Sequence, residues 1–339
     1  MAAHALPWFA PTTIWVSLAM LFGSAVMAAD APLTEPVGYY MLRPGSGPIP
    51  LTPEMLSNPH LAGFELRDRW SSVNPRPGVF DFSRLKAARD KVKASGKQYM
   101  LAILTGTSAP EWLYARGVKP IQLSRPGKYS PTDTMPAPWD AKMLLYYDQL
   151  VAALAKEFAA DPALVKINVG GPTCNSLEMH MPAEVKVIPG ADALLIEAWT
   201  SSLKSFDKRF RRTAISVNLA NPLRGGDGVA AEVAERAVRI LGARATLQHD
   251  GYNAKDELES YVIHRLLVEH GRRGVRIGFE QVCSASKPRY GRHAGGESGA
   301  SFAWSVERAR AAGAQFFDLY HPDELLLTSP FAPRPRERK

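Results

Sequence analysis

Two glutamates carry the clearest chemical signal in this sequence of 339 residues. Glu280 closes the apolar run 275–280, and Glu178 lies in the segment that follows the apolar run 165–169. Two carboxylates that flank a glycosidic bond can cleave it: one donates a proton to the leaving oxygen, and the other attacks the anomeric carbon or activates water. A carboxyl separation of roughly 5 Å gives retention and roughly 6.5–9.5 Å gives inversion. Glu178 and Glu280 are therefore the candidate catalytic residues.

Further polar side chains stand at the ends of neighbouring apolar runs. Arg67, which ends the second run, or Arg69, two residues later, would keep the attacking carboxylate ionised by hydrogen bonding. The candidates after the fifth, sixth and eighth runs are Asn218, His249, Tyr252 and Tyr320. His249 and Tyr252 would touch the nucleophile or serve as loop residues, and the other two would bind sugar hydroxyls.

Short apolar runs alternate with amphipathic stretches along the chain. The eight runs are 36–40, 62–67, 98–104, 165–169, 213–218, 245–249, 275–280 and 315–320. The helical patterns cover 82–94, 141–158, 191–210, 229–241, 256–270 and 301–312. Alternating strands and helices predict parallel βαβ units, and eight of them predict a single (β/α)8 TIM barrel. An open doubly wound sheet is the alternative, but its Gly-rich loop after the first strand is missing.

Three long loops follow predicted strands, at 105–140, 170–190 and 281–299. All three leave the carboxyl ends of their strands, which is the face where barrel enzymes build their active sites. Glu178 lies in the second of these loops, and Glu280 directly precedes the third. The predicted barrel therefore brings both glutamates to one face.

The second βα unit resembles the clan A glycoside hydrolases. Residues 67–82, RDRWSSVNPRPGVFDF, are similar to the Arg, Trp-Ser and "Pro-x-x-Gly-x-Phe-Asp-Phe" pattern of family 42 β-galactosidases and family 5 cellulase-like enzymes. Residues 108–113, SAPEWL, are similar to the "Pro-x-Trp-Leu" loop of the same enzymes. The resemblance covers 62–115 and implies a retaining mechanism, with Glu178 as acid/base and Glu280 as nucleophile. It also favours Arg67 over Arg69, and Trp70 and Trp112 as sugar-stacking side chains.

The chain departs from this family around Glu178. Clan A enzymes usually place Asn directly before the acid/base, whereas Leu177 stands there in this sequence. The local pattern "Gly-Pro-(x)5-Glu-Met-x-x-Pro" is instead similar to that of β-amylases, whose Glu is the acid. Retention and inversion therefore both stay open.

The N-terminal segment predicts that the protein is exported. Residues 13–29 are apolar and end in small residues, which is typical of a signal peptide, 1–29, cut before the barrel domain, 30–329. An uncleaved membrane anchor and a misplaced start are the alternatives. The basic tail, 330–339, is expected to be disordered. The predicted localisation is secreted or periplasmic, without stable membrane insertion after signal cleavage.

Composition narrows the partners. The formal net charge is +8, but no aromatic-interleaved basic stripe occurs, so we expect no nucleic-acid partner. The two carboxylates and the resemblance imply a carbohydrate substrate, an oligosaccharide or polysaccharide. The two cysteines, Cys174 and Cys283, follow the fourth and seventh strands and would form a bridge or remain as thiols.

Two other functions compete with an exported glycoside hydrolase acting on β-linked glycosides. A metal-dependent barrel hydrolase would use His180, His249, His321 and Glu280, but the first strand lacks the expected His-x-His. A non-catalytic carbohydrate-binding barrel would keep the aromatic residues and lose the function of one carboxylate. For the glycosidase we expect no cofactor and no metal ion.

Overall fold

The structure is a computed structural model that describes residues 1, 32–43, 49–125, 130–223, 228–252, 258, 261–281, 299–320, 327 and 331. The chain divides into a short unit, Met1–Pro32, and a large unit, Leu33–Lys339, which holds the fold discussed below. The predicted signal peptide lies almost wholly outside the described residues. In the described part of the chain, no helix has both the length and the apolar character to cross a membrane.

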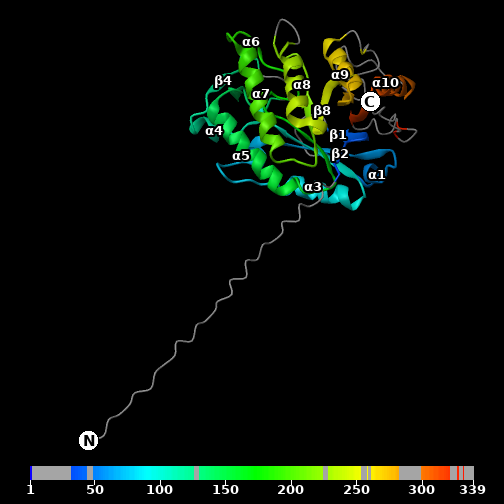
Figure 1. Ribbon diagram of the computed structural model, residues 1–339, viewed down its shortest axis with the longest axis horizontal. Helices are drawn as coiled ribbons and strands as arrows, with labels where there is room; N and C mark the ends of the chain where they lie inside the picture. Colours follow the sequence, from blue (N-terminus) through cyan, green and yellow to red (C-terminus); the bar gives the residue numbers. More distant parts are fainter. Residues whose placement is uncertain are drawn as a thin grey trace. The chain divides into compact units, whose positions relative to one another are not determined.

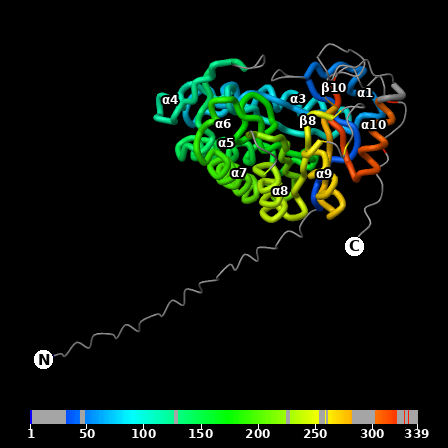
Figure 2. The backbone as a smooth tube through the Cα atoms, turned by 90° about the horizontal axis from the view of Figure 1, so that it is seen from above, coloured from blue at the N-terminus to red at the C-terminus, as the bar shows by residue number. Residues whose placement is uncertain are grey.

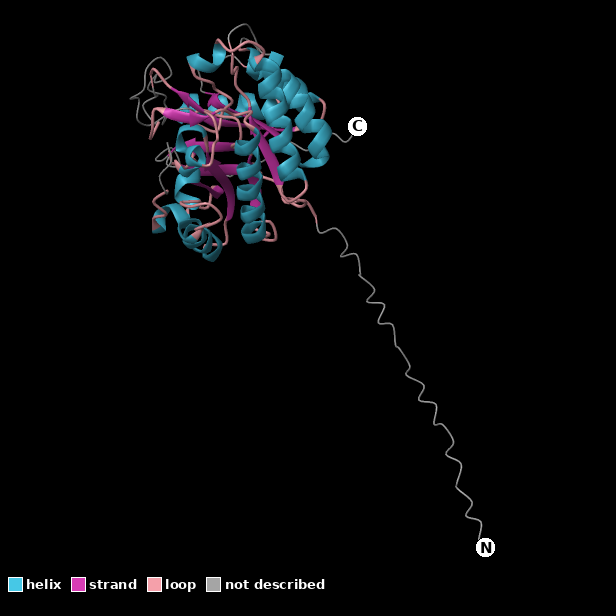
Figure 3. Cartoon of the chain, turned by 90° about the vertical axis from the view of Figure 1, so that its left-hand side faces the viewer, coloured by secondary structure: helices cyan, strands magenta, loops and turns pink. Residues whose placement is uncertain are grey.

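Eight parallel strands close into a barrel in the order β1-β10-β9-β8-β7-β6-β3-β2. Helices surround the strands, as Figures 1 and 3 show for the large unit. The strands are β1 (Gly38–Leu42), β2 (Leu61–Arg69), β3 (Gln98–Leu104), β6 (Leu164–Asn168), β7 (Ala214–Asn218), β8 (Ala245–Tyr252), β9 (Arg276–Gln281) and β10 (Ala314–Tyr320). Each of the eight predicted strands overlaps one of these, so the predicted (β/α)8 barrel is confirmed.

The helices that alternate with the strands also match their predicted positions. They are α3 (Ser83–Ala94), α5 (Ala141–Phe158), α7 (Ala191–Asp207), α8 (Gly228–Leu241), α9 (Val262–Arg272) and α10 (Gly299–Ala311). Shorter helices are α1 (Pro53–Ser57), α2 (Trp70–Val73), α4 (Trp112–Ala115) and α6 (Ala183–Lys186), with 3-10 turns η1 (Gly106–Ser108) and η2 (Gly242–Arg244). Helices α7 and α8 pack side by side, and α5 packs on α7 (Figure 2).

Helix α5 shows how the sequence forms the outer layer. Asp140 caps its first turn by accepting hydrogen bonds from the backbone N–H groups of Lys142 and Met143, which have no partner within the helix. The residues buried against the barrel are Met143, Tyr147, Leu150, Val151, Leu154 and Phe158. Their spacing places them on one face of the helix.

The loop between β3 and α5 contains a feature that the sequence pattern does not predict. Strands β4 (Pro120–Gln122) and β5 (Thr134–Pro136) pair antiparallel and form a small separate sheet. At the start of this loop Gly106 has a φ of +56°, and a Cβ there would lie 1.8 Å from the carbonyl oxygen of Cys174. Only glycine allows this approach, which holds the loop after β3 against the loop after β6.

The end of the chain differs from the prediction at one described residue. Phe331, inside the tail expected to be disordered, packs its ring against Tyr39, with 5.3 Å between the ring centroids. It also contacts Phe317 of β10 at 5.9 Å. At this position the predicted disorder is therefore wrong, and residues 332–339 lie outside the described part of the chain.

Candidate active site

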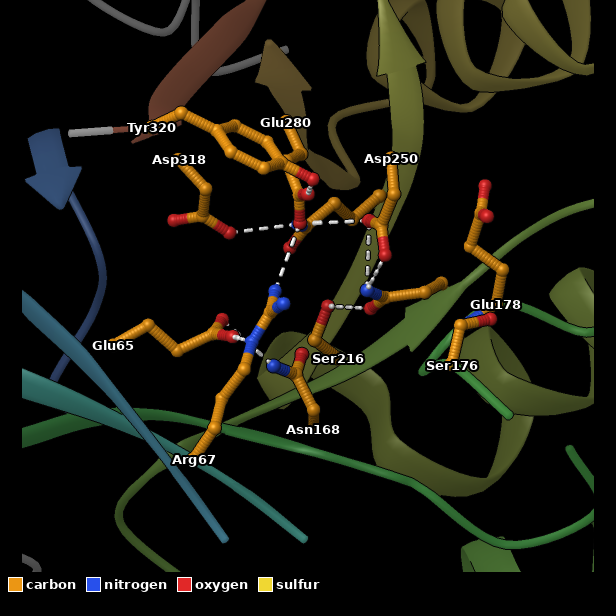
Figure 4. A network of polar contacts seen from close by, with 12 residues as sticks. Glu65, Arg67, Asn168, Ser176, Glu178, Ser216, Asp250, Glu280, Asp318 and Tyr320 are labelled. Atoms are coloured by element: carbon orange, nitrogen blue, oxygen red, sulfur yellow. Dashed lines mark hydrogen bonds and ion pairs between the residues drawn. The ribbon is translucent and has the colours of Figure 1, made fainter. Parts of the chain in front are cut away.

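The barrel interior is charged near the carboxyl ends of its strands. Because alternate residues of a strand face inward, polar residues two positions apart line the interior. The inward polar side chains are Glu65 and Arg67 of β2, Lys166 and Asn168 of β6, Ser216 and Asn218 of β7, Gln248 and Asp250 of β8, Glu280 of β9, and Asp318 and Tyr320 of β10. They form one network of hydrogen bonds and ion pairs, part of which Figure 4 shows.

Glu280 ends the inward row of β9 and is held from two other strands. Arg67 donates from Nη2 to Oε2 of Glu280 at 2.8 Å, and the Tyr320 hydroxyl donates to Oε1 at 2.7 Å. The Glu280 side chain is only 3% exposed. Burial raises the pKa of Glu280 to about 7, and the Arg67 charge opposes that rise. One oriented, nearly buried carboxylate thus stands at the predicted position.

Arg67 occupies the centre of the network. Its Nε also donates to Glu65, whose other carboxylate oxygen accepts a hydrogen bond from Asn168 at 3.0 Å. Lys166 lies 3.5 Å from Glu65 and 3.0 Å from Asp318. Burial opposes ionisation of Glu65, but the charges of Arg67 and Lys166 outweigh it and lower the pKa of Glu65. Arg67 is therefore fixed by one ionised carboxylate while it binds another.

Glu178 reaches the same end of the barrel from its loop. The backbone N–H of Met179 donates to the carbonyl of Asn218 at 3.2 Å, so Glu178 is bridged to the last residue of β7. Its carboxylate lies 3.3 Å from Nε2 of His180 and 3.8 Å from Nε2 of His249. Its side chain is 16% exposed.

The surroundings of Glu178 favour its ionised form, whereas a general acid must be protonated before it reacts. Burial favours the protonated form, but the hydrogen bond and charge of His180, with His249 and Arg67, outweigh it and hold the pKa of Glu178 below its usual value. The same contact with Glu178 raises the pKa of His180. The contact between Glu178 and His180 therefore favours the ionised carboxylate and the protonated imidazole.

A third acidic side chain, Asp250, was not among the predicted site residues. Asn218 donates from Nδ2 to both of its oxygens at 2.8 Å, and Gln248 donates to Oδ1 at 3.1 Å. Figure 4 shows Asp250 between Glu280 and Glu178. The signal that would have found it is the spacing of Gln248 and Asp250, which matches the spacing of the polar pairs in β2, β6 and β10.

Two predicted substrate-binding residues lie elsewhere. Trp70 is fully buried at the start of α2, packs edge-on against Tyr147 and donates its indole N–H to Asn74. Tyr252 is fully buried as well, and its hydroxyl donates to the carbonyl of Ser305 in α10. Neither ring offers a face to a sugar, so both predictions are wrong, and the two residues stabilise the packing of helices on the barrel.

The remaining predicted residues lie at or near the network. Asn218 donates a hydrogen bond to Asp250, and Tyr320 donates one to Glu280. His249 contacts Glu178 and is hydrogen-bonded through Nδ1 to His264 at 2.9 Å. Trp112 is half-buried, and its indole N–H donates to the carbonyl of Asn74 at 2.9 Å. Its predicted contact with sugar stays a prediction.

Two alternatives from the sequence can be checked against the described residues. Among them, no group of three or more His, Cys, Asp and Glu side chains is arranged to hold a metal ion. Cys174 is a buried free thiol. Cys283 and His321 lie outside the described part of the chain.

The chain has a closed parallel barrel with acidic side chains at the carboxyl ends of its strands. In these features it is similar to the (β/α)8 glycoside hydrolases. Residues 63–183 match the model of glycoside hydrolase family 42, described as beta-galactosidase. This match confirms the resemblance found in the second βα unit, and it includes Arg67 and Glu178. It supports a glycosidase. No curated protein matches the sequence.

Solved structures share the fold at low sequence identity. The catalytic domain of beta-amylase from Paenibacillus polymyxa is 13% identical with a TM-score of 0.52, over 88% of this chain and 96% of that one. Endo-glycoceramidase II from a Rhodococcus species is 14% identical with a TM-score of 0.53, over 85% and 75%. Beta-galactosidase from the psychrophilic Marinomonas ef1 is 10% identical with a TM-score of 0.54, over 83% and 53%. These similarities show the fold alone.

Proposed function

We propose that this chain is an exported glycosidase that cleaves β-linked glycosides with retention of configuration. The observation that carries the proposal is the fixed orientation of Glu280, a buried carboxylate at the end of β9. Arg67 donates a hydrogen bond to one of its oxygens, and Tyr320 donates to the other. A nucleophile needs this fixed geometry, because a positioned attacking atom lowers the entropic part of the barrier. The description of the matching family supports β-galactosides as the first substrates to test.

Glu178 is the proposed acid/base. Its proton is stored on His180, 3.3 Å away, and passes through Glu178 to the leaving oxygen. The pair then holds one proton less, and Glu178 can accept a proton from the water that attacks the glycosyl-enzyme. His249, at 3.8 Å, limits the positions that the carboxylate can take.

Glu178→Gln tests this role. For a substrate with a poor leaving group we expect kcat to fall by about 100-fold, since general acid catalysis contributes this much or more. An activated aryl β-glycoside needs no protonation of its leaving group, so its first step should proceed at nearly the wild-type rate. Burst kinetics with both substrates measure this difference. An equal loss for both leaving groups would remove Glu178 from the acid/base role.

The pH dependence tests the nucleophile independently. Burial raises the pKa of Glu280 to about 7, so the fraction of ionised, reactive Glu280 falls as pH drops through neutrality. We therefore expect kcat/KM to be highest above this range and to decline about tenfold per pH unit below it. A profile of kcat/KM between pH 4 and 9 measures this decline, the acid limb of the profile. An acid limb centred below pH 5 would contradict the assignment.

One feature favours the alternative of a non-catalytic carbohydrate-binding barrel, namely the contact with His180 that lowers the pKa of Glu178 and so opposes the protonated form that a general acid needs. A screen of aryl β-glycosides with galactosyl, glucosyl and other sugars separates the two functions. Release of the aryl group that disappears in Glu280→Gln supports the glycosidase. Binding of oligosaccharides without any release would support the alternative.

A further inference from the structure

Asp250 is a carboxyl group that the two-carboxylate scheme leaves without a role. It is 9% exposed and lies on β8, next to the strand that carries Glu280. Nδ2 of Asn218 donates to both of its oxygens at 2.8 Å, and Nε2 of Gln248 donates to Oδ1 at 3.1 Å. These partners are all N–H donors, which is the hydrogen-bond pattern of an ionised carboxylate. Asp250 is therefore held in one orientation, as an acceptor.

Asp250 differs from the other carboxylates of the network in its partners. Each of the others has a basic nitrogen within 4 Å. These pairs are Glu65 and Glu280 with Arg67, Asp318 with Lys166, and Glu178 with His180. In the part of the chain that the structure describes, no lysine, arginine or histidine nitrogen lies that close to the oxygens of Asp250. A buried charge normally has a cationic partner, so this one is incompletely compensated.

The whole network is short of positive charge and of hydrogen-bond donors. Its five carboxylates share Arg67, Lys166 and the two histidines beside Glu178, so negative charge is in excess even when both imidazoles are protonated. The chain as a whole carries +8, so this excess is local. Within the described structure, Oδ1 of Asn168 and Oδ1 of Asp318 are buried and accept no hydrogen bond. A ligand that is positively charged and donates hydrogen bonds would supply what is missing.

The charges around Asp250 oppose the form that its hydrogen bonds favour. Burial raises the pKa of Asp250 well above its ordinary value, and the carboxylates of Glu280 and Glu178 add to the rise. Arg67 acts against it, but its guanidinium is already bound to Glu280. A further cation beside Asp250 would remove this conflict, because an opposite charge stabilises the ionised carboxylate.

The position of Asp250 identifies the part of a substrate that it would meet. Figure 4 shows it between Glu280 and Glu178. In a glycosidase the anomeric carbon of the reacting sugar lies between the two catalytic carboxylates. The substituent on the adjacent carbon, C2, is one bond away from that atom. A protonated amine at C2 offers a positive charge and three N–H donors, as the ammonium of lysine does.

We propose that the reacting sugar carries a free amino group at C2 and that Asp250 binds its ammonium. The substrate class is then the β-linked 2-amino-2-deoxyglycosides. This inference rests on the proposed function and names the substrate for the same site. An ammonium at C2 also opposes the positive charge that develops on the sugar ring in the oxocarbenium-like transition state. The carboxylate of Asp250 offsets that repulsion, so its contribution appears in kcat as well as in binding.

The test compares aryl β-glycosides that differ only at C2, with an amine, a hydroxyl or an acetamide. At pH 6.5 the amine is protonated, as an α-amino group is. We expect the wild type to have a kcat/KM at least about tenfold higher for the amine than for the other two compounds. Asp250→Asn keeps the shape of the side chain and should lower kcat/KM for the amine by about 30-fold or more, because it breaks a buried charge pair. The loss for the hydroxyl compound should be far smaller.

Asp148→Asn is the matched control. It removes a carboxylate on α5 that is 32% exposed and already paired with Arg209 at 2.7 Å. It should keep the wild-type ratio of kcat/KM between the amine and the hydroxyl compound. An equal loss on all three compounds in Asp250→Asn would show a structural role and overturn the proposal. A wild type that cleaves the hydroxyl compound as well as the amine, or better, would also overturn it, and the proposed function would stand.

Binding to the wild type decides the matter without any variant and without turnover. Methyl 2-amino-2-deoxy-β-glycosides and methyl β-glycosides of the gluco and galacto series are compared by the rise in Tm that each causes. At concentrations well above both Kd values, a tenfold tighter Kd for an amino sugar adds about 2 °C. Equal shifts, or no shift with any amino sugar, would overturn the proposal. If no aryl glycoside is cleaved, the proposed function fails, and the Tm comparison still shows whether the centre prefers an amino sugar.

Discussion

Glu280→Gln is expected to lower kcat by on the order of 10⁴-fold on every glycoside that the wild type cleaves. The amide keeps the shape of the side chain and its hydrogen bond from Tyr320, but it cannot attack the anomeric carbon. Steady-state assays with an aryl β-glycoside measure the loss. In Glu280→Gly, which leaves room for a small anion, addition of azide should restore turnover and give the α-glycosyl azide if the wild-type mechanism is retaining.

The matched control is Glu235→Gln. Glu235 is also paired with an arginine, Arg273, but its side chain is 46% exposed on α8. This variant should keep kcat within about twofold of the wild type, since it is far from the barrel interior. Comparable kcat values for Glu280→Gln and the wild type would exclude Glu280 as nucleophile.

Arg67→Met is expected to reduce the free energy of unfolding by about 3–5 kcal/mol at pH 8 and to abolish measurable turnover. The change leaves the buried carboxylates of Glu65 and Glu280 without the guanidinium that contacts both of them. The loss should be smaller at pH 5, because Glu280 can then take up a proton and become neutral. Urea unfolding at the two pH values measures the difference.

Arg273→Met is the control for this variant. Arg273 is 53% exposed, and exposed ion pairs contribute about 1 kcal/mol or less. Its removal should therefore change the free energy of unfolding by no more than that amount, and equally at both pH values. If Arg67→Met were no more destabilising than Arg273→Met, the network around Arg67 would not hold the site together.

The fold was predictable because its signal is local. Each strand is a short apolar run, and each long helix has an apolar face at helical spacing, as in α5. The β4–β5 pair escaped prediction because its strands have three residues each, include prolines and show no alternation that separates them from loop. Its pairing comes from the way the loop folds over the rim.

The site was predictable only in part. Glu280 follows from its position at the end of a strand and Arg67 from the resemblance in the second βα unit, and the structure places them in contact. Asp250 was missed although its spacing from Gln248 repeats the polar pairs of β2, β6 and β10, because this spacing becomes informative only when the inward face of each strand is known. Trp70 and Tyr252 were assigned to sugar binding because residue type alone does not tell whether an aromatic ring at a strand end faces the barrel mouth or the surrounding helices. Packing of α2 and α10 decides that, and it is a property of distant parts of the chain.

Asn218 makes two different contacts, one through its backbone and one through its side chain, and substitution affects only the second. The loop that carries Glu178 is anchored through the backbone carbonyl of residue 218, which every amino acid possesses. The orientation of Asp250 depends on the amide side chain of the same residue. Substitutions at position 218 can therefore retune the acidity of the barrel interior while the loop stays in register, so pH optimum and loop placement can diverge independently among descendants of this chain.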